Sequence, residues 1–168
     1  MLGVQQPIDT YFQTCSTVIS RIDQLQVRCL SDHLYHAWEC RRFVFALGNG
    51  GAGSTAGHFA EDLLKSTLDP SEFHNDEARR FRVMSLSENT SSILAWANDE
   101  GFEHVFVEQL KNFASPSDVL IAMSGSGNSD NVLPAVIAGE SPCNQTETVG
   151  PVNGTQYDVA VATSTHRN

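Results

Sequence analysis

A run of apolar residues that leads directly into a cluster of glycines constrains this chain more than any other stretch. Residues 43–48 read Phe-Val-Phe-Ala-Leu-Gly, and residues 48–53 contain four glycines before helix-like sequence begins at Ser54. Such an apolar run is typical of a strand buried in a parallel sheet, and glycines allow positive φ and close approach to the backbone. The stretch therefore predicts a strand, a turn able to hold an anion, and a helix start.

Length and composition indicate a single globular domain. The chain has 168 residues, of which 40% are hydrophobic and 18% charged, and no apolar run approaches the roughly 20 residues of a membrane span. The N-terminus lacks the basic region and apolar core of a signal peptide, so a cytoplasmic location is expected. The four cysteines include no C-x-x-C pair, which favours reduced thiols. A formal charge of −10 argues against direct binding to nucleic acid.

Apolar runs and helical periodicity alternate along the chain. The pattern predicts helices over residues 4–25, 30–38, 54–66, 90–97, 102–113 and 131–138, and strands over residues 43–48, 82–86 and 118–123. Strands that alternate with helices predict an α/β fold with a parallel sheet covered on both faces. Residues 140–156 contain no apolar run suited to a strand, and strand character returns only at residues 157–162.

The two N-terminal helices are expected to form a hairpin ahead of the first strand. Their apolar residues recur at three- and four-residue steps and exceed what is needed to cap a sheet. Two alternatives follow: this surface packs on the core of the same chain, or it packs against a neighbouring subunit.

A second apolar strand also leads into a polar loop that contains glycine. Residues 124–129 read Ser-Gly-Ser-Gly-Asn-Ser, and their hydroxyls are suited to a phosphate. Neither this serine loop (residues 124–129) nor the glycine segment (residues 48–53) is a Walker loop or a dinucleotide fingerprint, which disfavours nucleotide binding. Ligands bind at the carboxyl ends of parallel strands, so the two segments predict a common site.

Several motifs in a fixed order resemble those of a known family. They are Gly-Asn-Gly-Gly at residues 48–51, His-Phe-Ala-Glu-Asp-Leu at 58–63, Ala-Asn-Asp-Glu-Gly-Phe at 97–102, Asp-Val-Leu at 118–120 and the serine loop. Over about residues 8–138 the chain resembles the sugar isomerase (SIS) domain of the phosphoheptose isomerase type. The resemblance implies one domain, with N-terminal helices over residues 1–40 and an α/β core over residues 41–168.

The same resemblance implies a fold, an assembly and a reaction. The fold is a three-layer, flavodoxin-like α/β sandwich with a central parallel sheet, and the assembly is a homotetramer with sites near its subunit interfaces. The reaction belongs to carbohydrate metabolism: an isomerase converts sedoheptulose 7-phosphate to D-glycero-D-manno-heptose 7-phosphate. No membrane or nucleic acid partner is expected.

The resemblance further implies which residues contact the sugar phosphate. The serine loop is expected to grip the phosphate through Ser124, Gly125, Ser126 and Ser129. The sugar is expected to lie against Asn49, Gly50 and Gly51, with Asn98 and Asp99 near its hydroxyls. The glycine segment then forms the sugar side of the pocket, and the serine loop forms the phosphate side.

Aldose–ketose isomerisation needs a base that moves a proton between C1 and C2. His58 and Asp62 are four residues apart on one predicted helix, so they face the same side and can share a proton or a metal. By resemblance Asp62 takes the place of a glutamate that serves as base and, in several members, as a zinc ligand. Glu61 has the longer side chain but points about 100° around the helix. His58, Glu61 and Asp62 are the catalytic candidates, with a possible partial zinc site at His58 and Asp62.

Two departures from the family pattern fit a truncated product, a sequence with a piece absent, or a divergent binding protein, and the last is the alternative to the isomerase. Ala52 stands where a serine is usual, and the C-terminal helix that carries a glutamine and a histidine in the family has no counterpart before Asn168. The alternative is a non-catalytic module for binding sugar phosphate or another protein, resembling the DnaA initiator-associating protein.

Overall fold

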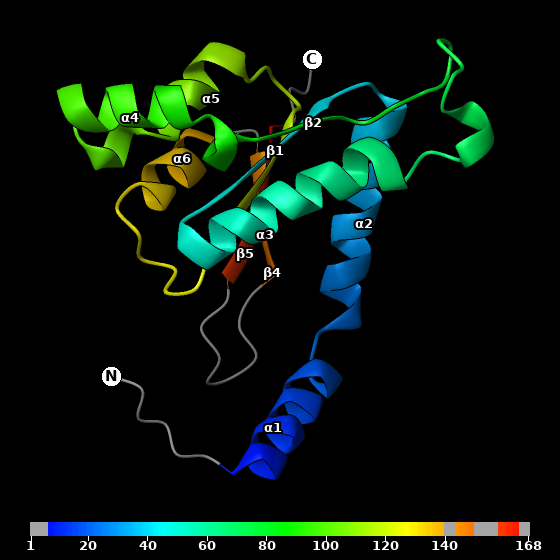
Figure 1. The fold of residues 1–168 in the computed structure, drawn as a ribbon, viewed down its shortest axis with the longest axis vertical. Helices are drawn as coiled ribbons and strands as arrows, with labels where there is room; N and C mark the ends of the chain where they lie inside the picture. The colour runs from blue at the N-terminus through cyan, green and yellow to red at the C-terminus, as the bar shows by residue number, and fades with distance from the viewer. Residues whose placement is uncertain (1–6, 140–143, 150–157, 165–168) are drawn as a thin grey trace.

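The computed structural model describes residues 7–139, 144–149 and 158–164, which form an α/β fold (Figure 1). The helices are α1 (Ile8–Ser20), α2 (Gln24–Glu39), α3 (Gly50–Glu61), α4 (Thr90–Asp99), α5 (Val107–Phe113) and α6 (Val132–Gly139). The strands are β1 (Phe43–Gly48), β2 (Arg82–Ser85), β3 (Val119–Ser124), β4 (Asn144–Val149) and β5 (Asp158–Ser164). A π-helical turn, Asp62–Ser66, continues α3, and short 3₁₀ turns lie at Pro70–Glu72, Leu86–Glu88 and Phe102–His104.

The sheet has the strand order β2-β1-β3-β5-β4. The expected parallel sheet is confirmed for β2, β1 and β3, which pair in parallel. The sheet is not parallel throughout, because β5 runs antiparallel to both β3 and β4. Only residues 150–157 connect β4 to β5. A link of that length suits antiparallel neighbours, because a parallel crossover usually needs a dozen or more residues.

The expectation that residues 140–156 contain no strand was wrong, because β4 occupies Asn144–Val149. This strand lies at the edge of the sheet and pairs only with β5 among the described strands. An edge strand does not need the continuous apolar run of a strand buried on both faces. Its sequence, Asn-Gln-Thr-Glu-Thr-Val, is polar for that reason and gave no apolar signal.

Two apolar cores lie on opposite faces of the sheet, as a three-layer sandwich requires. On one face, Val44 of β1 packs with Ala37 of α2 and Ala60 of α3. On the other face, Phe45 of β1 packs with Leu110 of α5 and other residues from α4, α5 and α6. Figure 1 shows α3 on one side of the strands and α4, α5 and α6 grouped on the other. The expected three-layer architecture is therefore confirmed.

The N-terminal helices do not form the expected hairpin. α1 contains no buried residue, and Figure 1 shows it projecting beyond the end of α2 and away from the sheet. Arg21 caps α1 in a right-handed conformation, and residues 21–23 include none with a positive φ, so α1 lacks the left-handed residue that commonly ends a helix. The side chains of Ile8 and Phe12 are 73% and 65% exposed. Among the residues that the structure describes, packing on the same chain is thus found for α2, through Ala37, whereas no residue of α1 is buried.

Within the described ranges, no helix has both the length and the apolar character needed to cross a membrane.

Asp118 joins the turn before β3 to the start of β1. Its Oδ1 accepts a hydrogen bond from the Phe43 backbone N–H at 2.8 Å, and its Oδ2 accepts one from the Ser115 N–H at 2.8 Å. Hydrogen bonds to a charged group contribute about 1.5–3 kcal/mol each. We therefore expect Asp118→Ala to lower the free energy of unfolding by about 2–4 kcal/mol in urea titrations. Asp76→Ala, which removes an exposed carboxylate, is the control, and equal losses in both variants would contradict this role.

Candidate functional site

The glycine segment and the serine loop lie side by side because they follow neighbouring parallel strands. Gly48, the last residue of β1, pairs with Met123 in β3, so Asn49, which follows β1, lies level with Ser124 at the end of β3. The carboxyl ends of parallel strands are where open α/β sheets bind ligands. The sheet thus brings together the two segments that sequence motifs single out.

A pair of side-chain amides joins the two segments. The Asn49 Nδ2 donates to Asn131 Oδ1 at 2.7 Å, and the Asn131 Nδ2 donates to Asn49 Oδ1 at 2.8 Å. Asn131 lies two residues after the end of the serine loop and is only 1% exposed. Sequence reasoning missed this residue; its one signal was a polar side chain between the serine loop and an apolar helix.

The glycine segment is mostly the first turn of α3 rather than a free loop. The helix begins at Gly50, four residues before the predicted start, and Gly50 has a φ of +51°. A Cβ at Gly53 would lie 2.7 Å from the Gly48 carbonyl oxygen, so this position needs glycine for close packing. A Cβ at Gly50 or Gly51 would have nothing within 4 Å, which leaves open space over the helix start. Asn49 occupies the N-cap position but makes no side-chain capping hydrogen bond.

The serine loop is closed by hydrogen bonds between its own residues. The Ser124 Oγ accepts from the Gly127 N–H at 3.1 Å and lies 3.4 Å from the Ser129 Oγ. The Ser126 Oγ instead accepts from the Asn128 N–H at 3.2 Å. Ser124 is 8% exposed, whereas Ser126 is exposed. The hydroxyls of Ser124 and Ser129 therefore converge on one point, with Ser126 at the rim.

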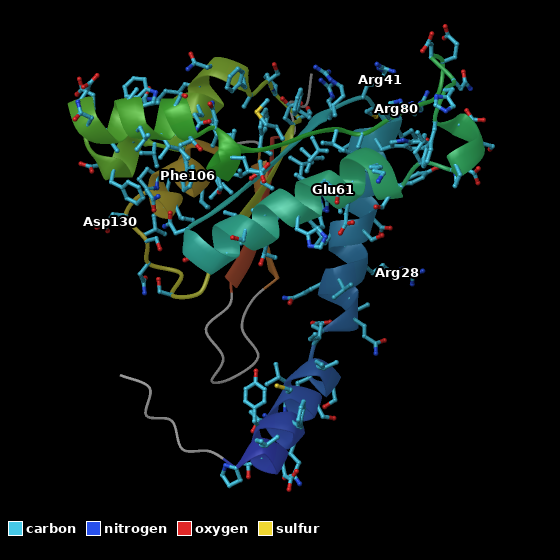
Figure 2. All side chains as sticks on the ribbon, viewed as in Figure 1. Arg28, Arg41, Glu61, Arg80, Phe106 and Asp130 are labelled. Atoms are coloured by element: carbon cyan, nitrogen blue, oxygen red, sulfur yellow. The ribbon has the colours of Figure 1, made fainter. Side chains whose placement is uncertain are left out.

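A cavity of about 310 Å³ opens beside the glycine segment. Its walls combine polar groups with apolar side chains, among them Asn49, Ser54, Ser87, Glu88, Phe102 and Phe106. In Figure 2, Phe106 and Asp130 lie toward the N-terminal end of α3, whereas Glu61 lies further along that helix. The cavity is large enough for a sugar and adjoins the open first turn of α3.

Two further polar residues, Ser87 and Gln109, stabilise the wall of this cavity through hydrogen bonds. The sequence motifs predicted a role for neither residue. The Ser87 Oγ accepts from the Gly48 N–H at 3.0 Å and donates to the Gly48 carbonyl at 2.8 Å. Gln109, which is fully buried, donates to the carbonyls of Leu86 and Val105 at 3.2 and 2.7 Å and accepts from Asn89 at 2.9 Å. A buried amide with these partners anchors the 3₁₀ turn that carries Ser87.

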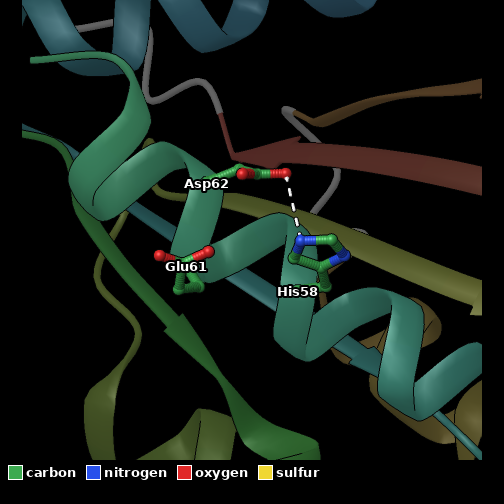
Figure 3. A group of neighbouring side chains, drawn as sticks. All are labelled: His58, Glu61 and Asp62. Atoms are coloured by element: carbon green, nitrogen blue, oxygen red, sulfur yellow. Dashed lines mark ion pairs between the residues drawn. The ribbon is translucent and has the colours of Figure 1, made fainter.

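His58, Glu61 and Asp62 gather on the outer surface of α3 (Figure 3). The His58 Nε2 lies 3.8 Å from the Asp62 Oδ2, and the two side chains are 77% and 54% exposed. One ligand atom from each of the three residues lies within 4.8 Å of the others. Glu61 is three residues from His58, a spacing that makes their side chains neighbours on a helix. One imidazole and two carboxylates are a donor set suited to zinc.

These acidic and imidazole side chains do not line the 310 Å³ cavity. Glu61 instead borders a second cavity of about 500 Å³ with Gly57, Ser85 and Glu88. Asn98 and Asp99 also lie apart from the first cavity, at the exposed end of α4, where the Asn98 Nδ2 donates to Asp99 Oδ1 at 2.6 Å. Within one protomer, the glycine segment and the serine loop come together, whereas Asn98, Asp99 and the predicted acid–base residues lie apart from the 310 Å³ cavity.

Comparison with known proteins identifies the family. The family described as "SIS domain" matches residues 10–142. The chain belongs to the SIS domain family. The resemblance predicted from motifs over residues 8–138 is thereby confirmed.

Curated relatives and solved structures agree with this SIS domain assignment. The phosphoheptose isomerase of Syntrophotalea carbinolica is 34% identical over 78% of this chain and 65% of its own length. The lincomycin biosynthesis protein LmbN of Streptomyces lincolnensis is 41% identical over 57% of this chain and 33% of its own length. The phosphoheptose isomerase GmhA from Neisseria gonorrhoeae superposes with a TM-score of 0.62 at 27% identity, over 76% of this chain and 62% of that one. The SIS domain described here therefore spans from one third to about two thirds of these proteins.

Proposed function

We propose that this SIS domain binds a sugar phosphate and isomerises sedoheptulose 7-phosphate to D-glycero-D-manno-heptose 7-phosphate. The observation that carries the proposal is the Asn49–Asn131 amide pair, which holds a phosphate-type loop beside an open glycine helix start. The likeness to phosphoheptose isomerases supports the choice of substrate.

In this proposal the serine loop binds the phosphate. The hydroxyls of Ser124 and Ser129 converge, Ser126 adds a third hydroxyl, and Gly125 lets the phosphate approach the backbone. None of these groups is charged, so hydrogen bonds and the start of α6 hold the anion rather than a basic side chain.

The sugar extends from the serine loop toward the glycine segment. Its hydroxyls meet the Asn49 amide and the open backbone at Gly50 and Gly51, and the 310 Å³ cavity accommodates the carbon chain. The proposed sugar-binding residues also include Asn98 and Asp99 at the end of α4. Both lie outside the 310 Å³ cavity of a single protomer.

Asp62 is the proposed base. Its carboxylate removes a proton from C1 of the ketose, which gives an enediolate. The carboxyl group then returns the proton to C2, which gives the aldose. His58, 3.8 Å away, orients the carboxylate and exchanges protons with the sugar oxygens, and Glu61 is the next carboxylate on the helix. Because these groups face outward, they act at a boundary between protomers in this proposal.

Zinc fits the donor set of His58, Glu61 and Asp62, and these are the residues that would hold it. A bound zinc ion supplies Lewis-acid polarisation of an oxygen on the sugar.

The outward position of the acid–base residues also supports the alternative function. A module that binds a sugar phosphate without converting it needs the two loops but not the His58–Asp62 pair. Turnover separates the two functions, because both predict binding and only the isomerase predicts product.

The test is an isomerisation assay with sedoheptulose 7-phosphate, with and without added zinc. We expect turnover by the wild-type protein, and a loss of kcat of about 100- to 10,000-fold in Asp62→Asn, which keeps the size of the side chain but removes the base. Calorimetry should give Asp62→Asn a Kd for the sugar phosphate close to that of the wild type.

Asp76→Asn removes an exposed carboxylate in the loop before β2 and serves as the matched control. Wild-type binding without product would reject the isomerase and support the binding module. An Asp62→Asn variant with full kcat would reject the role of this carboxylate.

A homotetramer is the proposed assembly, and the exposed apolar face of α1 supports it. Phe12 and Ile19 lie two turns apart on that face and are 65% and 67% exposed. We expect light scattering to give a mass near four times 18.3 kDa, and Phe12→Glu with Ile19→Glu to give a smaller species. Thr10→Glu with Thr17→Glu adds the same charge to the polar face and should leave the mass unchanged. A mass that neither pair alters would contradict an α1 interface.

We also propose a cytoplasmic location for this protein. Cys15 and Cys40 form no disulfide among the described residues, and reduced thiols suit that compartment.

A further inference from the structure

We infer that Asn131 is a positioning residue that keeps the side chain of Asn49 away from the N-terminus of α3, so that this helix start stays open to the sugar. The inference rests on the proposed function for the identity of the ligand. It concerns a residue that makes no proposed contact with that ligand.

The amide pair fixes the orientation of Asn49. Each amide donates one N–H and offers one carbonyl oxygen, and both hydrogen bonds, at 2.7 and 2.8 Å, form only when the two groups lie head to tail. If either amide alone were flipped, an N–H group would face an N–H group and a carbonyl oxygen would face a carbonyl oxygen, so both hydrogen bonds would be lost. Asn131 is 1% exposed, so water cannot easily replace Asn49 as its partner.

Without this pairing, Asn49 would have a different partner. It occupies the N-cap of α3, where an asparagine side chain usually accepts from a backbone N–H in the first helical turn. In this protein it makes no such bond, and the positions of Gly50 and Gly51 border open space. Asn131 therefore holds Asn49 in place and leaves the first-turn N–H groups for a ligand oxygen.

The same pair sets the distance between the two ends of the site. Asn131 immediately precedes α6, and the Val132 N–H donates to the Ser129 carbonyl at 2.9 Å, which ties Asn131 to the serine loop. Asn49 lines the cavity on the sugar side. One amide pair thus links the group that faces the sugar to the loop that faces the phosphate.

The experiment is a double-mutant cycle in the full chain, with binding of sedoheptulose 7-phosphate measured by calorimetry. We expect Asn131→Ala to weaken binding about tenfold or more, which corresponds to about 1.4 kcal/mol or more. We expect Asn49→Ala to weaken it at least as much. Because Asn131 acts through Asn49, the double variant should bind like Asn49→Ala alone. Asn112→Ala, which removes an exposed amide on α5, is the control.

Hydrogen exchange gives a readout that does not depend on the ligand. In Asn131→Ala the freed Asn49 side chain should cap α3, so the Gly51 and Ala52 amides should exchange more slowly relative to core amides of β1. The double variant has no such cap and should lose this added protection.

Three results overturn the inference: wild-type affinity in Asn131→Ala, additive losses in the double variant, or first-turn exchange that Asn131→Ala does not slow. A wild-type protein that fails to bind sedoheptulose 7-phosphate rejects the proposed function instead. In that case the exchange measurement alone decides whether Asn131 holds Asn49 off the helix.

Discussion

Replacing two serines of the serine loop should abolish sugar-phosphate binding. In Ser124→Ala with Ser126→Ala, a phosphate loses two hydroxyl donors, each worth about 1.5–3 kcal/mol when the acceptor is charged. The expected loss of affinity for sedoheptulose 7-phosphate is at least about 100-fold in calorimetry. No basic side chain is part of the loop to compensate.

Ser115→Ala is the matched control because Ser115 is exposed and precedes β3, at the opposite end of the strand from Ser124. Its affinity should equal that of the wild type. Thermal unfolding of the double variant checks that the loop change has not unfolded the domain. Unchanged affinity in a folded double variant would remove the serine loop from the site.

A second large effect is expected at Gly48, where β1 meets the helix start. A Cβ there would lie 2.8 Å from the Met123 carbonyl oxygen and 2.8 Å from the Ala52 carbonyl carbon. Both neighbours are backbone atoms held by the sheet and by α3, so neither can move without breaking hydrogen bonds. We expect Gly48→Ala to lower the free energy of unfolding by at least about 3 kcal/mol in urea titrations.

Gly51→Ala is the control for this substitution, because a Cβ at Gly51 meets nothing within 4 Å. Alanine is a better helix former than glycine, so the free energy of unfolding of Gly51→Ala should stay unchanged or rise by up to about 1 kcal/mol. Similar losses in both variants would show that the close packing at Gly48 is not what requires glycine.

The central part of the fold could be predicted because its signals are local. β1 and β3 are continuous apolar runs, and each leads into a polar segment rich in glycine or serine. Burial on both faces of a parallel strand requires such a run. The positions of the glycine segment and serine loop at one edge of the sheet followed from that pattern.

Other parts could not be predicted because they depend on partners distant in the sequence. β4 is a polar edge strand that pairs with β5, and the apolar pattern of α1 predicts a buried face that the structure leaves exposed. Asn131 and Gln109 are ordinary polar residues until the fold buries them against Asn49 and Leu86. A pattern of residue types does not reveal such pairings.

The helix spacing predicted that His58 and Asp62 lie together, and the structure brings them within 3.8 Å. It did not predict that they face away from the 310 Å³ cavity, because the rotation of α3 depends on its packing through residues such as Ala56 and Ala60. The assignment of catalytic roles to this pair stays a prediction for the assay of Asp62→Asn.

The central claim is that the glycine segment and the serine loop form one sugar-phosphate site. A crystal structure of the protein with sedoheptulose 7-phosphate tests it most directly. We predict a phosphate within hydrogen-bonding distance of the Ser124 and Ser129 hydroxyls, with the sugar against Asn49 and the start of α3. A phosphate bound away from the serine loop, or a sugar chain that does not reach Asn49, would contradict the account.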